Sequence, residues 1–156
     1  MIAETAETVV LLNEKMLIIF NRCPVTSEYF NGKCYRPLPK DTQPNSAGSC
    51  FNSGGELVSI STVGEQIYIE SYMSSKNLWN SYWIGLEENQ TKASFYSWSD
   101  GSVYEFTNWN SNEPGISSSG NCVIIDGSNS IHLPWSERQC NSSYPGFCEY
   151  GTQFYL

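Results

Sequence analysis

Two carboxylates in one polar stretch of the chain have the chemistry of a ligand site. Glu113 and Glu137 lie in the segment 109–140, which is rich in Ser, Asn and Gly and ends at Cys140. Carboxylate and amide oxygens are the groups that coordinate calcium and accept hydrogen bonds from polar ligands. Long polar loops on a rigid scaffold are also where binding sites concentrate. We therefore interpret segment 109–140 as a binding loop.

An enzymatic site is not indicated by these residues. His132 is the one histidine of the chain, and its surroundings contain no nucleophile motif such as Gly-x-Ser-x-Gly. A hydrolase that used Glu113 and Glu137 as a carboxylate pair would need a raised pKa on one of them, and nothing in the sequence argues for one. We predict that the chain is not an enzyme and that His132 is a loop residue.

The composition favours one acidic domain with disulfide bonds. The 156 residues suffice for a single domain, and the net charge of -8 comes without a cluster of Lys or Arg. Nucleic acid binding therefore has no electrostatic support, whereas the acidity serves either a cation site or solubility. Six cysteines without a Cys-x-x-Cys pair favour disulfides over zinc and imply an oxidising, extracellular compartment. In a secreted protein, sequons at Asn89 and Asn141 would be glycan acceptors.

The N-terminal segment, residues 1–22, fits no single class. Residues 9–12 and 16–20 are apolar, but polar residues separate them, and Glu4 and Glu7 stand where a signal peptide carries positive charge. The run is too short and too charged to give a clear membrane span. Three interpretations stay open: an imperfect signal sequence, a remnant of an anchor, or the first edge strand of the fold.

A hairpin and a proline-rich segment follow. Asn31-Gly32 is a strong two-residue turn signal, and a hairpin there would bring Cys23 and Cys34 close enough to bond. Because proline cannot donate to a ladder, three prolines then predict a loop outside any sheet: Pro37, Pro39 and Pro44.

Two helices are expected in the first half of the chain. Asn45 or Ser46 can cap the first helix, which would end at Gly54-Gly55. The second helix is expected to start at the capping box Thr62-Val63-Gly64-Glu65 and to run to about Ser75.

The other elements read as strands. We expect strands at 57–60, 82–86, 94–99, 122–126 and 146–150, with residues 103–106 following a turn at Asp100-Gly101. In the strand 94–99, Tyr96 and Trp98 lie on one face. Two early helices followed mainly by strands indicate an α+β fold with an antiparallel sheet.

These pieces together resemble the C-type lectin-like domain in its long form, which has an extra N-terminal hairpin. The residues that carry the resemblance are Cys50, the run 55–60, Glu65, Trp83-Ile84-Gly85-Leu86, Trp98-Ser99-Asp100-Gly101, Asn108-Trp109, Glu113-Pro114, Asn121-Cys122-Val123, Trp135, Cys140 and Phe147-Cys148-Glu149. The resemblance covers residues 23–150 and leaves 151–156 as a C-terminal tail. It implies two helices, antiparallel sheets and a long ligand loop.

The resemblance also selects a disulfide pairing and a role for the tryptophans. It implies the pairs Cys23–Cys34, Cys50–Cys148 and Cys122–Cys140, of which the last staples the end of the ligand loop. It further implies that Trp83 and Trp98 belong to the core, and that Trp109 and Trp135 hold the long loop to the sheet.

In sugar-binding members of this family, one calcium ion sits on the long loop and the sugar hydroxyls complete its coordination. Carried over to this sequence, the ligand-binding positions are Glu113, Pro114, Asn121, Ser136 and Glu137, and the calcium ligands among them are Glu113, Asn121 and Glu137. The resemblance also implies a cis peptide bond before Pro114.

The sequence departs from the family pattern in ways that weaken a calcium site. Gly115 replaces an Asn or Asp with a side-chain oxygen, and Gly120 stands where the family has a glutamate. Two carboxylates, where tight sites use more, indicate millimolar affinity at best. A second family calcium position near Glu88 has Lys92 among the expected acids. Alternatively, Glu113 and Glu137 are solvated or pair with Arg138 or Lys92.

The sequence thus predicts an extracellular carbohydrate-binding module whose calcium dependence is weak or absent, and whose partner is a glycan or glycoprotein. The alternative is a calcium-independent module that recognises a protein, which exposed aromatic residues near Tyr104, Phe106 and Tyr144 would favour. The type of sugar does not follow from a Glu-Pro-Gly triplet, and the fold alone does not fix the function.

Overall fold

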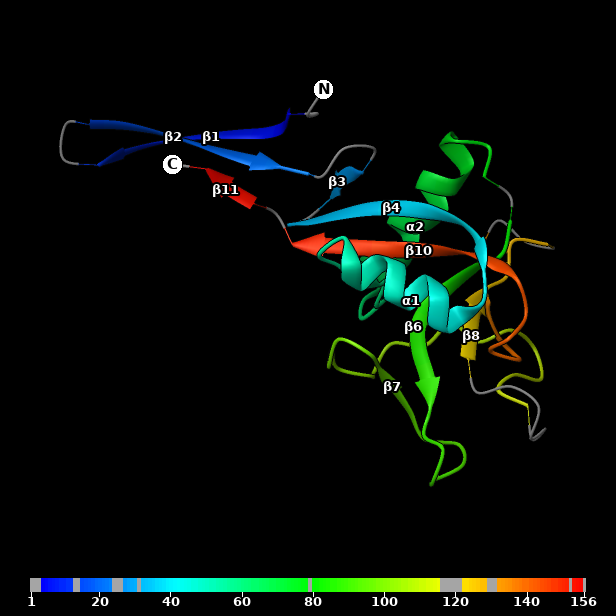
Figure 1. The fold of residues 1–156 in the computed structure, drawn as a ribbon. Coiled ribbons are helices and arrows are strands. Elements are labelled where there is room, and N and C mark those ends of the chain that lie inside the picture. Colours follow the sequence, from blue (N-terminus) through cyan, green and yellow to red (C-terminus); the bar gives the residue numbers. More distant parts are fainter. Residues whose placement is uncertain are drawn as a thin grey trace.

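The computed structural model describes residues 4–12, 15–23, 27–30, 32–78, 80–115, 122–128, 132–151 and 153–155, with side chains from Cys23 to Gly151. Predictions on Gly120 and Asn121 lie outside these residues. Figure 1 shows a main domain and, beside it, a small sheet that joins the two ends of the chain. That sheet consists of β1 (Glu4–Leu12), β2 (Lys15–Arg22) and β11 (Gln153–Tyr155), paired antiparallel in the order β1-β2-β11. Domain limits at residues 22 and 151 stay a prediction.

The main sheet is built from strands far apart in the sequence. Its order is β3 (Glu28–Phe30), β4 (Lys33–Asp41), β10 (Tyr144–Gly151), β6 (Tyr82–Glu88), β8 (Cys122–Ile125) and β9 (Trp135–Arg138). Two short strands join it from the side: β5 (Glu56–Leu57) on β10 and β7 (Tyr96–Trp98) on β6. The pairing is antiparallel except for the contact of β10 with β6 at Gly146 and Trp83, which is parallel. The α+β class is confirmed, and the sheet is mixed.

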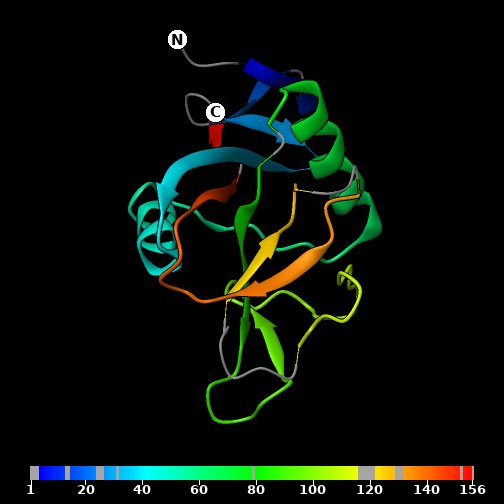
Figure 2. The ribbon, with the colours of Figure 1, turned by 90° about the vertical axis from the view of Figure 1, so that its right-hand side faces the viewer.

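Two helices flank the sheet, as predicted, and Figure 2 shows them on its opposite sides. Helix α1 (Gln43–Asn52) begins earlier than expected, because its cap is Thr42, whose hydroxyl accepts from the Asn45 N–H at 3.4 Å. Pro44 fits in the first helical turn, where its missing N–H costs nothing. Helix α2 (Val63–Ser75) has the predicted cap: Thr62 accepts from the Glu65 N–H at 3.1 Å.

Three strand predictions need correction. The prolines do not form a loop, since Pro44 lies in α1 and Pro37 and Pro39 lie in β4. This is possible because β3 pairs with β4 only as far as Tyr35, so that β4 is an edge strand from there on, where proline is tolerated. The strand predicted from residue 94 begins at Tyr96, since Ser94 has a positive φ of 67°. The strand predicted at 57–60 is regular only at Glu56–Leu57.

Residues 101–108 form no strand either. Tyr104 and Phe106 pack against the core cluster there and do not join a ladder, which accounts for the alternation of half-buried and exposed positions in this segment.

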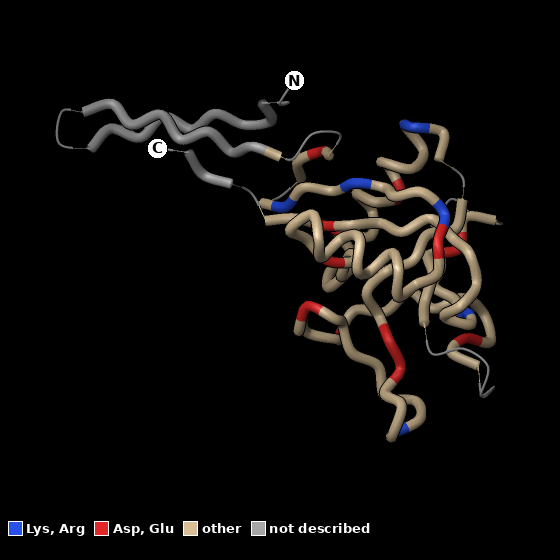
Figure 3. Tube along the Cα trace, in the orientation of Figure 1, with Lys and Arg blue, Asp and Glu red and all other residues tan. Residues whose placement is uncertain are grey.

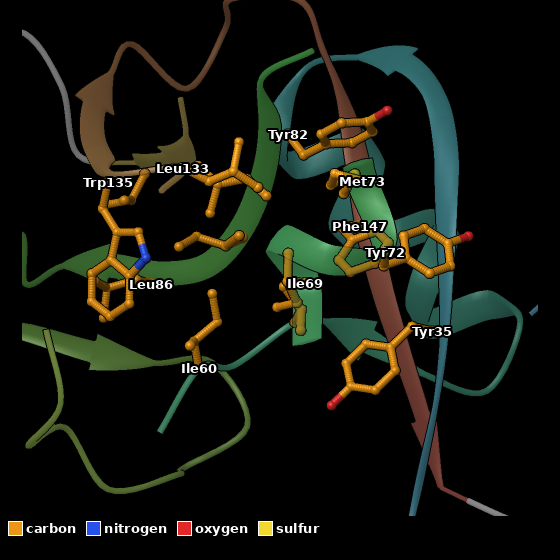
Figure 4. Packing of buried hydrophobic residues seen from close by; sticks show 14 of the residues in the cluster. Tyr35, Ile60, Ile69, Tyr72, Met73, Tyr82, Leu86, Leu133, Trp135 and Phe147 are labelled. Carbon is orange, nitrogen blue, oxygen red and sulfur yellow. The ribbon is translucent and has the colours of Figure 1, made fainter. Parts of the chain in front are cut away.

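The core lies between α2 and the strands of the sheet (Figure 4). Ile69 and Met73 of α2 pack with Phe147 of β10, and the buried Trp135 closes the cluster at the side of the ligand loop. Trp83 and Trp98 are 0% and 2% exposed, so both belong to the core as predicted.

All six cysteines are paired as the family resemblance implies. Cys23–Cys34 closes the N-terminal hairpin, and Cys50–Cys148 joins α1 to β10. Cys122–Cys140 joins β8 to the turn that follows β9. Their Cα–Cα distances are 5.4, 5.6 and 5.2 Å, ordinary values for a disulfide. In the part of the chain that the structure describes, no helix is long and apolar enough to cross a membrane.

Candidate ligand site

The two ends of the binding loop are held to each other by main-chain hydrogen bonds. The Trp135 N–H donates to the carbonyl of Asn108 at 2.7 Å, and the Asn110 N–H donates to the carbonyl of Trp135 at 2.8 Å. Trp135 is fully buried and its indole N–H donates to Gln66 of α2 at 3.1 Å, while the ring of Trp109 packs on it edge to face. The predicted role of Trp109 and Trp135 in holding the loop to the fold is confirmed.

An aromatic cluster lies beside these anchors. The rings of Tyr96 and Trp109 meet edge to face with centroids 5.0 Å apart, and the Trp109 indole donates to the Tyr104 hydroxyl at 3.1 Å. Tyr104, Phe106 and Tyr144 are half-buried, so they do not form the exposed aromatic surface that the protein-binding alternative expects. The exposed aromatic rings of the described residues are Phe51 and Phe95.

Glu113 sits on a tight turn that aims its carboxylate back at the chain. The turn is closed by the Glu113 N–H, which donates to Asn110 at 3.0 Å, and Asn112 has a positive φ of 64°. The bond before Pro114 is cis, as the resemblance implies. Glu113 Oε2 accepts from the Gly115 N–H at 3.0 Å, and its Oε1 lies 4.0 Å from Arg138 Nη1.

Glu137, on β9, is held by a hydroxyl from another strand. Its Oε1 accepts a short hydrogen bond from Tyr96 of β7. Burial raises the pKa of Glu137, the Tyr96 hydrogen bond lowers it, and the negative charges of Glu88 and Glu113 raise it further, with a net rise. Burial and the bond to Glu137 together raise the pKa of Tyr96, so this hydroxyl is a permanent donor.

Arg138 supplies the positive charge of the site. Its guanidinium lies between Glu113 and the buried Asp126, with Nη2 3.4 Å from Asp126 Oδ2. Burial alone would raise the pKa of Asp126, but hydrogen bonds from Ser128 and the charge of Arg138 lower it. The predicted pairing of Glu113 with Arg138 is thus observed, whereas Lys92 lies 3.7 Å above the ring of Phe95.

The remaining predicted positions are less accessible or fall outside the description. Ser136 is 1% exposed, and its hydroxyl accepts from Asn110 Nδ2 at 3.4 Å. Asn121 lies outside the described residues. His132 is exposed in a turn, and its carbonyl accepts from Gln66 and Asn108. The ligand roles of Ser136 and Asn121 stay predictions, and His132 is a loop residue as predicted.

The sequon asparagines both lie on the surface. Asn89 is exposed, and its side-chain oxygen accepts from the N–H and hydroxyl of Thr91 at 2.9 and 2.8 Å. Asn141 is exposed in the turn after Cys140. Both are accessible to a modifying enzyme, and glycosylation itself stays a prediction.

The described donors near Glu113 do not by themselves make up a calcium shell. Calcium needs six to eight oxygens, but Glu113 faces a guanidinium and Glu137 accepts from a hydroxyl. Gly115 adds no side-chain oxygen at the third position of the triplet. Among the residues that the structure describes, no group of three His, Cys, Asp or Glu side chains is placed to hold a metal ion. Glu113 has the charge of Arg138 beside it, and Glu137 has a neutral hydrogen-bond donor in Tyr96.

Tyr96 is the site residue that sequence reasoning did not identify. Its face in the strand, shared with Trp98, was predicted, but its partner lies 41 residues away on β9.

The position of Lys and Arg in Figure 3 agrees with the absence of a basic cluster in the sequence, because the blue segments of the described chain are separated from one another.

Comparison with known proteins identifies the relatives of this chain. The sequence profile of a family described as Lectin C-type domain matches residues 40–150. The human C-type mannose receptor 2 is 34% identical over 134 residues, which are 84% of this chain and 9% of the receptor. This chain therefore spans only a small part of that relative.

Two solved structures have the same fold. The cow CD23 carbohydrate-recognition domain, solved in the presence of a GlcNAc2Man3 oligosaccharide, is 27% identical with a TM-score of 0.73, covering 85% of this chain and 98% of that one. Human lithostathine, at 24% identity, has a TM-score of 0.76 and covers 83% of this chain and 90% of its own, which is a likeness of fold.

Proposed function

The chain belongs to the C-type lectin domain family, and from this premise we propose that it is an extracellular module that binds glycans through segment 109–140 with weak or absent calcium dependence. The observation that carries the proposal is that both loop acids already have partners within the protein. Glu137 is held by Tyr96 and Glu113 lies beside Arg138, so both acids are positioned by the protein itself.

The same groups suit the recognition of a sugar. Carboxylate oxygens accept hydrogen bonds from neighbouring hydroxyls, and Glu113 and Glu137 come from the two ends of one loop. The half-buried rings of Trp109 and Tyr104 offer apolar surface beside them. Among the relatives, the cow CD23 domain was solved in the presence of an oligosaccharide, which supports a glycan as the ligand class for this chain.

The described ends of this loop are held together without a metal. The disulfide Cys122–Cys140 and the bonds between Asn108, Asn110 and Trp135 fix its ends, and fixing a binding loop in advance lowers the entropy lost on binding. Calcium would have to compete with Arg138 for Glu113 and with Tyr96 for Glu137, which supports weak or absent calcium dependence.

An extracellular location is supported by the covalent structure. Three disulfides persist in oxidising compartments, and the relative with 34% identity is a receptor.

The second candidate function is calcium-independent recognition of a protein. It is favoured by the burial of Ser136 and by the engagement of Glu113 with Arg138, which leave fewer polar groups for sugar hydroxyls.

A glycan array, probed once with calcium and once with a chelator, tests the proposal. We expect the same glycans to be bound in both conditions, and the variant Glu137→Gln to lose them. Signals that vanish with the chelator would contradict the calcium-independent part, and no signal in either condition would favour the protein-binding candidate.

A further inference from the structure

A cavity outside the ligand loop has the chemistry of a second site. It has a volume of about 450 Å3 and lies where the C-terminal end of α1 meets the end of β10 that leads to β11 (Figure 1). Residues from the α1 end, β4, β10 and the turn after β7 line it, and none of them belongs to segment 109–140. Cavities of this size are typical of small-ligand sites in proteins.

The polar side of the cavity is dominated by carboxylates. Asp100 and Glu149 lie close together, since Ser59 Oγ is 2.6 Å from Asp100 Oδ2 and 3.0 Å from Glu149 Oε1. The lining includes Lys33, but its ammonium group is already shared between Glu149, at 3.0 Å, and Glu65, at 3.2 Å. The lining thus carries the acids Glu56, Asp100 and Glu149 against one lysine, so its net charge favours a cationic ligand over an anionic one.

The other side of the cavity is apolar. Phe51, at the end of α1, is 75% exposed, a large hydrophobic side chain with no burial role in the fold. Tyr150 also lines the cavity although it is only 3% exposed, and its hydroxyl accepts from Arg36 at 2.8 Å. Gly55 lets its segment pass close to β10, because a Cβ at this position would lie 2.4 Å from the Glu149 carbonyl oxygen.

We propose that this cavity is a second binding site, and that its ligand is an ammonium group on an apolar or aromatic stem. The ammonium lies against Asp100 and Glu149, and the stem packs on the exposed ring of Phe51. A bare metal ion fits less well, because the described residues hold no group of three metal-ligating side chains and because one face is aromatic. The two possible sources of such a group are a small free amine and the lysine side chain of a partner.

Titration of the 15N-labelled protein with benzylamine tests the site, at a mildly alkaline pH where Glu149 is ionised. We expect saturable shifts at the backbone amides of Gly54, Gly55 and Gly151, and none with benzyl alcohol, which has the same shape without the charge. Parallel titration with Nα-acetyl-lysine amide separates the sources: tighter binding of benzylamine indicates a small amine, and tighter binding of the lysine compound indicates a protein partner.

Matched variants locate the binding. Asp100→Asn should weaken benzylamine binding about ten-fold, the usual worth of one charge-assisted hydrogen bond. Phe51→Ser should weaken it as well, and because Phe51 is exposed this variant tests the site even if Asp100→Asn folds poorly. Glu113→Gln, in the ligand loop, should leave it unchanged. Equal shifts with benzyl alcohol, no saturable shift, or full binding by Phe51→Ser would overturn the proposal.

Discussion

Two acidic clusters of the molecule are built from the same kinds of groups but in different surroundings. At the ligand loop, Glu137 accepts from a tyrosine hydroxyl and Glu113 lies beside Arg138. At the inner cluster, which we define as Lys33, Ser59, Glu65, Asp100 and Glu149, a serine hydroxyl and one lysine serve three carboxylates.

The difference is burial. The Glu149 residue is 7% exposed, and burial together with the hydrogen bond to Asp100 raises its pKa to about 7, although Lys33 opposes the rise. The side chain of Glu113 is 20% exposed, whereas that of Glu149 is 9% exposed. We therefore expect the inner cluster to affect stability more strongly than the loop cluster does.

The largest expected effect is a dependence of stability on pH that comes from Glu149. Its pKa in the folded state, about 7, lies above the ordinary value of 4.5, so the folded protein binds this proton more tightly than the unfolded chain does. Stability should therefore fall as pH rises from about 4.5 to about 7, by about 3 kcal/mol. The raised pKa of Glu137 acts in the same direction. The lowered pKa of Asp100 acts in the opposite direction, because its contribution to stability is lost as pH falls, and it acts only at lower pH.

Urea unfolding over this pH range measures the effect. Glu149→Gln should flatten the curve, because glutamine does not titrate. If the wild type and the variant give parallel curves, Glu149 is not the group responsible.

The next effect is the loss of the cation of the inner cluster. Lys33→Ala leaves Glu65 and Glu149 without their shared partner, and we expect the free energy of unfolding to fall by about 2 kcal/mol at neutral pH. The matched loop variant, Arg138→Ala, removes contacts of 4.0 Å with Glu113 and 3.4 Å with Asp126, which are longer than those of Lys33, and should cost about 1 kcal/mol. Chemical unfolding of both variants measures these losses. A larger loss of unfolding free energy for Arg138→Ala would contradict the stronger effect of the inner cluster on stability.

A smaller effect is expected at the loop hydroxyl. Tyr96→Phe removes the donor to Glu137, which should lower the free energy of unfolding by about 1 kcal/mol and weaken glycan binding. Ser97→Ala changes the exposed neighbour on the same strand and should change neither quantity. Thermal unfolding and glycan titration of the pair give the answer, and equal behaviour of the two variants would remove Tyr96 from the site.

The elements that position the loop could largely be predicted from the sequence. The capping box at Thr62, the buried strand at Trp83 and the hairpin before Cys34 all follow from local patterns, and the disulfide pairing followed from the family resemblance. The prolines of β4 misled the prediction, because their tolerance depends on where the neighbouring strand β3 ends, which is a property of the tertiary structure.

The partners of the acids could be predicted only in part. Arg138 lies next to Glu137 in the sequence, so the sequence already offers it as a pairing partner for both acids. The hydroxyl of Tyr96 and the cluster of Asp100 with Glu149 join residues more than 40 positions apart. No periodicity or spacing rule brings such residues together, since their meeting depends on the register of strands and on the path of an irregular loop.

A calcium titration monitored by thermal unfolding tests the central claim most directly, because a ligand that binds only the folded state must raise the melting temperature. Because Glu113 already lies beside Arg138 and Glu137 already accepts from Tyr96, the melting temperature should not change up to about 5 mM calcium. This is the range in which weak extracellular calcium sites fill. A saturable rise over that range, abolished by Glu113→Gln, would contradict the account.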